Sequence, residues 1–138
     1  TGNKMHKLIE LEGIGPKYAE MLKRVGIESQ DDLLRVCSSR RGRFRVAEQT
    51  GISHKLILKW TNQADLARVN GINEEYAELL EQAGIDSIPE LAHCNPEQLY
   101  SSLKEKNEKC HLALHIPGLS QVVTWVEQAK KLPRAVYH

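Results

Sequence analysis

Several features that would assign this chain of 138 residues to a class of protein are scarce or missing. It has three cysteines, an odd number too small for a framework of disulfides, so we expect reduced thiols. Its longest uninterrupted apolar runs, such as residues 56–58, have three residues, whereas a membrane span needs roughly 18. Aromatic residues make up only 5% of the chain. A transmembrane helix and a disulfide-linked miniprotein are therefore excluded. A chain of this length can bury a hydrophobic core that needs no disulfide or metal ion to stabilise it.

A strong net charge is also missing, because 19 Lys and Arg residues nearly balance 18 Asp and Glu residues. The balance conceals a difference between the two halves of the chain. Residues 1–65 hold 12 basic and 8 acidic residues, a net charge of +4, whereas residues 66–138 hold 7 and 10, a net charge of −3. No apolar stretch follows Lys4 and Lys7, as it would in a secretion signal, so we expect a cytoplasmic location.

What the chain does contain is a duplication. Residues 8–33 align without a gap with residues 66–91, at an offset of 58, and 11 of the 26 positions are identical. Further along, at an offset of 65, a Trp, a Gln and an Ala recur with the same spacing. These identities predict two repeats, residues 1–65 and residues 66–138. The matched pairs are Leu8 and Leu66, Gly13 and Gly71, Ile14 and Ile72, Tyr18 and Tyr76, Ala19 and Ala77, Glu20 and Glu78, Leu22 and Leu80, Gly26 and Gly84, Ile27 and Ile85, Ser29 and Ser87, Leu33 and Leu91, Trp60 and Trp125, Gln63 and Gln128, and Ala64 and Ala129.

The punctuation inside each repeat is helical, and no segment shows the alternation of apolar and polar residues that is typical of a strand. Pro16 suits the first turn of a helix, Gly26 ends that helix, and Ser29 caps the next one. The predicted fold class is all-α. The expected helices cover residues 5–11, 16–25, 30–36, 43–49 and 54–69 in the first repeat, and residues 74–82, 88–94, 96–106 and 119–132 in the second.

The segment Leu8-x-x-Leu11-x-Gly13-Ile14-Gly15-Pro16-Lys17-x-Ala19-x-x-Leu22 resembles the signature of the helix-hairpin-helix superfamily. The resemblance implies two tandem helix-hairpin-helix repeats of about 60 residues, packed as one compact SAM-like helical domain. It also implies that the hairpin grips a backbone phosphate of a nucleic acid and reads no bases. The Gly-Ile-Gly-Pro-Lys-Tyr-Ala and Trp-x-x-Gln-Ala features are more narrowly similar to an uncharacterised bacterial family of helix-hairpin-helix proteins.

The residue types in this region suit contact with phosphate. Two glycines permit backbone angles that other residues resist, and they let the chain approach a partner closely. Their N–H groups and the start of the next helix form an anion-binding nest, while the apolar residue between them anchors the hairpin. Four arginines within residues 40–45 add guanidinium forks that match phosphate oxygens. The residues predicted to bind nucleic acid are Gly13, Ile14, Gly15, Lys17, Lys23, Arg24, Arg40, Arg41, Arg43 and Arg45.

Each of these features also has a purely structural interpretation. The turn at residues 13–16 could simply connect two antiparallel helices, and the arginines could form a solvated surface. We expect Phe44 in the core rather than as a platform for bases, and Trp60 and Trp125 as core anchors. In the second repeat, Asn-Glu-Glu at residues 73–75 replaces the Gly-Pro-Lys of the first hairpin. Two carboxylates would repel a phosphate, so we do not expect the second hairpin to bind one.

No motif of a known catalytic class is present. The sequence has no Walker-type loop, no nucleophile elbow and no paired-carboxylate motif. DNA glycosylases that contain this hairpin add a catalytic Lys or Asp beyond it, and the stretch at residues 116–119 is not followed by such an Asp. The Cys and His residues at 93–94 and 110–115 could converge on zinc, but no Cys-x-x-Cys pair exists. We therefore expect no catalysis, no metal and no cofactor.

The sequence predicts a non-catalytic module that binds nucleic acid without sequence specificity, DNA more readily than RNA, through its first hairpin. The alternative is a module for protein interaction, either an adaptor or a self-associating one. In the self-associating version, the basic half of one copy would meet the acidic half of another. We expect a monomer or weak self-association, and no contact with membranes.

Overall fold

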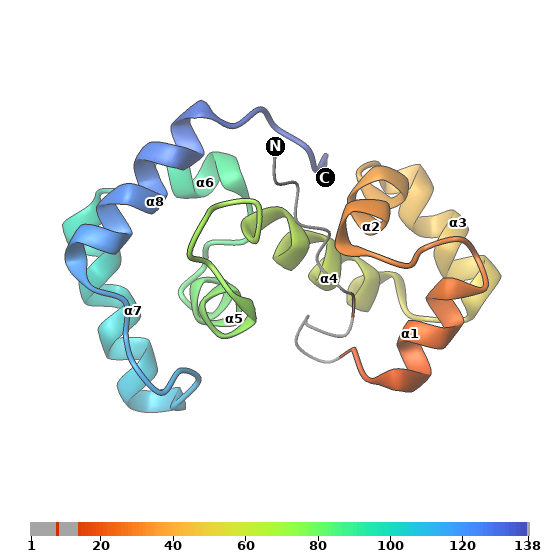
Figure 1. Ribbon diagram of the computed structural model, residues 1–138, viewed down its shortest axis with the longest axis horizontal. Helices are drawn as coiled ribbons and strands as arrows, with labels where there is room; N and C mark the ends of the chain where they lie inside the picture. Colours follow the sequence, from red (N-terminus) through yellow and green to blue (C-terminus); the bar gives the residue numbers. More distant parts are fainter. Residues whose placement is uncertain (1–7, 9–13, 138) are drawn as a thin grey trace. The chain divides into compact units, whose positions relative to one another are not determined.

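Eight helices make up the described part of the protein. The computed structural model describes residues 8 and 14–137, and within them the helices follow one another without a β-strand (Figure 1). The all-α class predicted from the sequence is confirmed. The helix expected at residues 5–11 lies outside the described residues, apart from Leu8. The helices are α1 (Pro16–Lys23), α2 (Gln30–Cys37), α3 (Arg40–Thr50), α4 (His54–Leu66), α5 (Glu74–Gln82), α6 (Ile88–Ala92), α7 (Pro96–Cys110) and α8 (Leu119–Lys131).

The chain divides into two compact units. The described residues of unit 1 are 8, 14–65 and 135–137, and unit 2 comprises Leu66–Arg134. We expected one core shared by the repeats, but the buried apolar residues form two clusters, because each repeat supplies its own Trp and its own Leu and Ile side chains. The last residues of the chain, which we assigned to the second repeat, group with unit 1, where Val136 is buried.

The duplication in the sequence is repeated in the packing of aromatic rings. In unit 1, the rings of Tyr18 and Trp60 lie with their centroids 5.2 Å apart and their planes at 58°. In unit 2, Tyr76 and Trp125 form the same pair, at 5.4 Å and 56°. Both indoles are buried, in the tilted arrangement that aromatic pairs prefer. The prediction that the two tryptophans are core anchors is therefore confirmed.

The first helix of each unit also ends in the same way. Gly26 and Gly84 both have a left-handed backbone, with φ of 86° and 93°. In unit 1, the N–H of the following residue, Ile27, donates to the carbonyl oxygen of Leu22 at 3.0 Å, and the equivalent bond in unit 2 is 2.9 Å long. This bond pattern closes a helix and needs a residue that tolerates positive φ. Glycine at these two positions is thus explained by helix termination alone.

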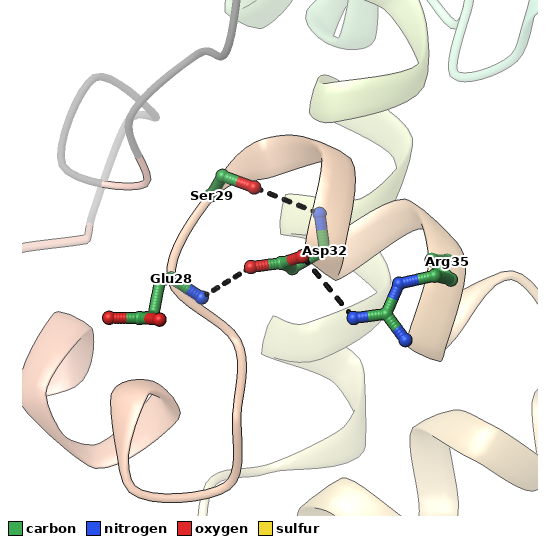
Figure 2. A network of polar contacts seen from close by, with 4 residues as sticks. All are labelled: Glu28, Ser29, Asp32 and Arg35. Atoms are coloured by element: carbon green, nitrogen blue, oxygen red, sulfur yellow. Dashed lines mark hydrogen bonds and ion pairs between the residues drawn. The ribbon is translucent and has the colours of Figure 1, made fainter.

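Figure 2 shows how α2 begins, in a small network of polar groups. The Ser29 hydroxyl oxygen accepts from the N–H of Asp32 at 3.0 Å, as predicted for an N-cap. The Asp32 carboxylate in turn accepts from the N–H of Glu28 at 3.0 Å and from the guanidinium of Arg35 at 3.2 Å. The bond from the Glu28 N–H is the main cause that lowers the pKa of Asp32. The polar side chains of Ser29 and Asp32 therefore stabilise the N-terminus of α2.

Candidate nucleic-acid interface

Helix α3 begins at Arg40, three residues earlier than the sequence predicted, and this determines where its arginines point. Ser39 caps it, and the Ser39 hydroxyl oxygen accepts from the N–H of Gly42 at 3.1 Å. Because the helix includes the whole basic stretch, its arginines are distributed around the helix axis. Arg43 and Val46 lie on the buried side. The other three arginines of the stretch, at positions 40, 41 and 45, are exposed.

Arg43 is used inside unit 1, which differs from its predicted role as a phosphate ligand. Its side chain is only 4% exposed. Nη1 donates to the carbonyl oxygens of Cys37 at 3.0 Å and Ser38 at 3.2 Å, and Nη2 donates to that of Tyr137 at 2.8 Å. A cation that binds the last carbonyls of α2 also interacts favourably with the negative end of that helix. Since the guanidinium is enclosed by these carbonyls, we remove Arg43 from the candidate interface.

The glycine within the basic stretch is required by the packing of α3 on α2. A Cβ atom added at Gly42 would overlap the carbonyl oxygen of Val36. The absence of a side chain lets the first turn of α3 lie directly against the last turn of α2, where Arg43 reaches its carbonyl partners. Gly42 and Arg43 together fix the orientation of α3 and hence the direction of the exposed arginines.

The exposed side of α3 carries an open depression of about 690 Å³. Arg41 and Arg45 make no hydrogen bond or ion pair within the described residues. Glu48 also lines the depression, and no ion pair joins it to either arginine in this part of the chain. Phe44 lies among them and is 41% exposed, so the prediction that it belongs to the core is wrong. We call this surface the α3 face, and its residues are Arg40, Arg41, Phe44, Arg45 and Glu48.

The charges of α3 are not arranged to stabilise the helix. Its first turn contains Arg40 and Arg41 and no acidic residue, although the N-terminal end of a helix favours negative charge. Arg41 and Arg45 are four residues apart, a spacing at which like charges repel on a helix. The third helix of unit 2 follows the favourable pattern, with Glu97 in its first turn. Such local conflicts with helix stability are expected where a residue is retained for contact with a ligand.

The hairpin turn before α1 is only partly described, because Gly13 lies outside the described residues. Ile14 is 3% exposed and packs in the unit 1 cluster, which confirms its predicted burial. Gly15 has φ of −88° and ψ of −178°, an extended conformation that any residue adopts, and a Cβ added there would meet nothing within 4 Å. Our expectation that Gly15 supplies an unusual backbone angle is therefore wrong. Its missing side chain leaves the start of α1 accessible instead.

The equivalent position in unit 2 makes this accessibility clear. Asn73 has nearly the same backbone as Gly15, with φ of −92° and ψ of −174°. Its side-chain oxygen accepts from the N–H of Tyr76 at 2.9 Å and caps α5. No side chain caps α1 in this way. Within the described residues, the N–H of Tyr18 thus lacks the side-chain acceptor that its counterpart, the N–H of Tyr76, has.

The remaining predicted cations are exposed and lie on α1 or at its end. Lys17 and Lys23 form no ion pair within residues 14–137, and Arg24 lies 3.9 Å from Glu20. In Figure 1, α1 begins at the lower edge of unit 1, whereas α3 begins near its upper edge. The starts of α1 and α3, and with them Lys17 and Arg40, therefore lie apart within unit 1.

No group of three or more His, Cys, Asp or Glu side chains in the described ranges is close enough to hold a metal ion. The thiols of Cys37, Cys94 and Cys110 are free. Of the helices described, none combines the length and the apolar character needed to cross a membrane.

Comparisons with known proteins agree with the expected membership of an uncharacterised family. No solved structure matches the chain. A family model described as a domain of unknown function, DUF4332, matches residues 12–132, from the first hairpin turn to the end of the last helix. The match includes both repeats and well over half of the chain. The chain belongs to the family described as domain of unknown function DUF4332.

Proposed function

We propose that this protein is a non-catalytic module that binds the backbone of nucleic acids, DNA in the first instance, through unit 1. One observation carries the proposal. The α3 face presents three arginines to solvent, and two of them, Arg40 and Arg41, lie in the first turn, where acidic residues would stabilise the helix. Arginine forks are suited to phosphate oxygens, which would relieve the repulsion between these cations.

The first hairpin supplies a second contact in this proposal. The uncapped N–H groups at the start of α1 and the exposed Lys17 favour an anion there. The resemblance to helix-hairpin-helix proteins points to the same ligand. Unit 2 has a capped hairpin with Glu74 and Glu75 in the first turn of α5, so it contributes no such contact. The net charges of +4 for residues 1–65 and −3 for residues 66–138 agree with this division.

The number of cations gives a quantitative expectation. If Lys17, Arg40, Arg41 and Arg45 each neutralise one phosphate, the logarithm of the affinity for duplex DNA falls with the logarithm of salt concentration with a slope of about −3.6. Binding is expected to be weak, roughly micromolar at physiological salt, since the module makes few contacts. Base sequence should have little effect, because contacts with phosphate carry no sequence information.

The test is fluorescence anisotropy of labelled duplex DNA, single-stranded DNA and RNA at about 50 and 200 mM salt, a range over which phosphate contacts strongly change affinity. The variant R41E/R45E should lose binding while its circular dichroism spectrum stays unchanged. A matched control, K104E/K131E, makes the same change in net charge at exposed lysines of unit 2 and should still bind. Equal affinities for the two variants, or no binding by the unchanged protein at the lower salt, would overturn the proposal.

A second candidate function is self-association or binding to a protein. It is favoured by the opposite net charges of the two halves of the chain, which allow a head-to-tail contact between copies. Sedimentation velocity at two protein concentrations and two salt concentrations tests it. A species that grows with concentration and dissociates in salt would support this candidate, and a monomer under all four conditions would remove the self-associating version.

A further inference from the structure

Phe44, the single phenylalanine of the chain, occupies an unusual place for its residue type. It is 41% exposed and lies in the α3 face, one helical turn after Arg40 and one turn before Glu48. It is absent from the side chains that pack on the unit 1 core. The ring thus stands on the surface, among three arginines and one glutamate, although large apolar side chains are usually buried.

The corresponding aromatic residue in unit 2 has a structural role. Counted from their N-caps, Phe44 is the fifth residue of α3 and Tyr100 is the fifth residue of α7. Tyr100 packs against the unit 2 core. The preceding residues in the two helices, Arg43 and Leu99, are both buried. The two helices thus bury the same position and differ in what they do with the next one.

The ring of Phe44 is held in place by its neighbours. The ring of His54 lies against it, with centroids 4.7 Å apart and planes at 33°. The guanidinium carbon of Arg40 lies 5.5 Å from the Phe44 centroid, a cation–π arrangement. Because Arg40 is exposed, its guanidinium can be displaced by another flat ring, which would then lie on the Phe44 ring that His54 supports.

Two further arginines, Arg41 and Arg45, line the same depression as Phe44. Arg41 and Arg45 are one helical turn apart, about 6 Å along the helix axis. This separation is of the order of the distance between successive phosphates of an extended strand. A nucleotide whose base lies on Phe44 would therefore have its own phosphate and that of its neighbour within reach of Arg41 and Arg45.

We infer that Phe44 is a stacking platform for an unpaired base, and that the α3 face therefore prefers single-stranded over double-stranded nucleic acid. This inference rests on the proposed function and specifies its ligand. In a duplex the faces of the bases are covered by their neighbours, whereas an unpaired base can leave its strand and lie on an aromatic ring. Stacking accepts every base, because each base has a π-face, so the preference requires no sequence specificity.

The test compares three probes of equal length: a single strand, its duplex, and a strand with abasic sugars that keeps the phosphates. The unchanged protein should bind the single strand about tenfold more tightly than the abasic strand, a typical effect of one stacked base. F44L keeps the apolar volume and removes the aromatic ring. It should lose this tenfold advantage while its affinities for the duplex and the abasic strand stay the same. F44W should keep or increase it.

Leu119 provides the matched control, since it is also 41% exposed but lies in unit 2. L119A should bind all three probes like the unchanged protein. Thermal unfolding followed by circular dichroism establishes that each variant is folded. If the protein binds the duplex and abasic probes but F44L binds the single strand normally, the stacking inference fails and the proposed function stands. If no probe binds and an acidic peptide does, both fail.

Discussion

The residue before the first helix is glycine in unit 1 and asparagine in unit 2, although both adopt the same backbone angles. Asn73 uses its side chain to cap α5, and Gly15 leaves α1 uncapped. The third helices differ in a similar way. Arg43 and Leu99 fill the same buried position, one with a cation bonded to three carbonyl oxygens and the other with an apolar side chain. The first difference leaves the start of α1 open, and the second adds a buried cation to unit 1.

The features that the units share lie elsewhere. The Tyr–Trp ring pair and the left-handed glycine after the first helix are the same in both copies. These features form each core and terminate its helices. The comparison teaches that the duplicated residues specify the shared fold, whereas the exposed residues of the candidate function, Gly15 and the arginines of the α3 face, are among those that differ. A change that converts a unit 1 residue into its unit 2 counterpart therefore tests this separation.

The largest effect is expected from R43L, which gives unit 1 the residue of unit 2 at this position. The carbonyl oxygens of Cys37, Ser38 and Tyr137 would lose a charged donor and remain buried or partly buried. We expect the free energy of unfolding of unit 1 to fall by about 3 kcal/mol. Hydrogen exchange measured by mass spectrometry should show faster exchange in α2, α3 and the last residues of the chain.

The reciprocal change provides the control for this prediction. L99R in unit 2 places a guanidinium among the buried apolar side chains that surround Leu99, so it should destabilise unit 2. Exchange in unit 1 should remain unchanged in this variant. Equal exchange rates in R43L and the unchanged protein would show that Arg43 contributes nothing to unit 1, and Arg43 would return to the candidate interface.

The positions of the arginines show what the sequence could and could not predict. The duplication, the all-α class, the cap at Ser29 and the end at Gly26 followed from local patterns that need no tertiary information. The start of α3 did not, because a basic stretch resembles a solvated loop and the cap at Ser39 was not recognised. When the helix starts at Arg40, Arg43 and Val46 are three residues apart and lie on the same side of it. Recognition of the helix start would therefore have placed Arg43 on the buried side with Val46.

Phe44 and the chain end were mispredicted for a different reason. Phenylalanine is usually buried, and only the completed helix shows that position 44 faces away from the core. The return of residues 135–137 to unit 1 depends on a carbonyl bonded to a side chain 94 positions earlier in the sequence. Contacts of that range leave no local signal. The site was thus predictable as a basic region, and its separation into exposed and buried members was not.

A smaller effect concerns the thiol of Cys37, for which unit 2 has no equally buried counterpart. Burial raises the pKa of Cys37 to about 11. The unfolded thiol ionises near pH 9, so above that pH the unfolded state loses a proton that the folded state keeps. The free energy of unfolding should therefore decrease by about 2 kcal/mol between pH 9 and 11, and the full contribution is present below pH 9.

Urea unfolding at several pH values measures this dependence. C37A removes the thiol, so the difference between its pH profile and that of the unchanged protein isolates the contribution of Cys37. C110A changes an exposed thiol and should reproduce the unchanged profile. Parallel profiles for C37A and the unchanged protein above pH 9 would mean that the buried thiol ionises as readily as an unfolded one.

The smallest change in stability, and the most direct test of the two hairpins, is expected from G15N. The new side chain adopts the backbone that Asn73 already has, and it finds open space. It should cap α1 and raise the free energy of unfolding by about 0.5 kcal/mol. Under the proposed function it should also weaken binding to nucleic acid several-fold, because the asparagine oxygen occupies the N–H groups that would bind a phosphate.

N73G makes the opposite change in unit 2 and should lower the free energy of unfolding by a similar amount with no effect on binding. A variant that becomes more stable and binds less tightly separates function from folding, since damage to the fold would lower both. If G15N binds as tightly as the unchanged protein, the first hairpin is a structural turn and the arginines of α3 act alone.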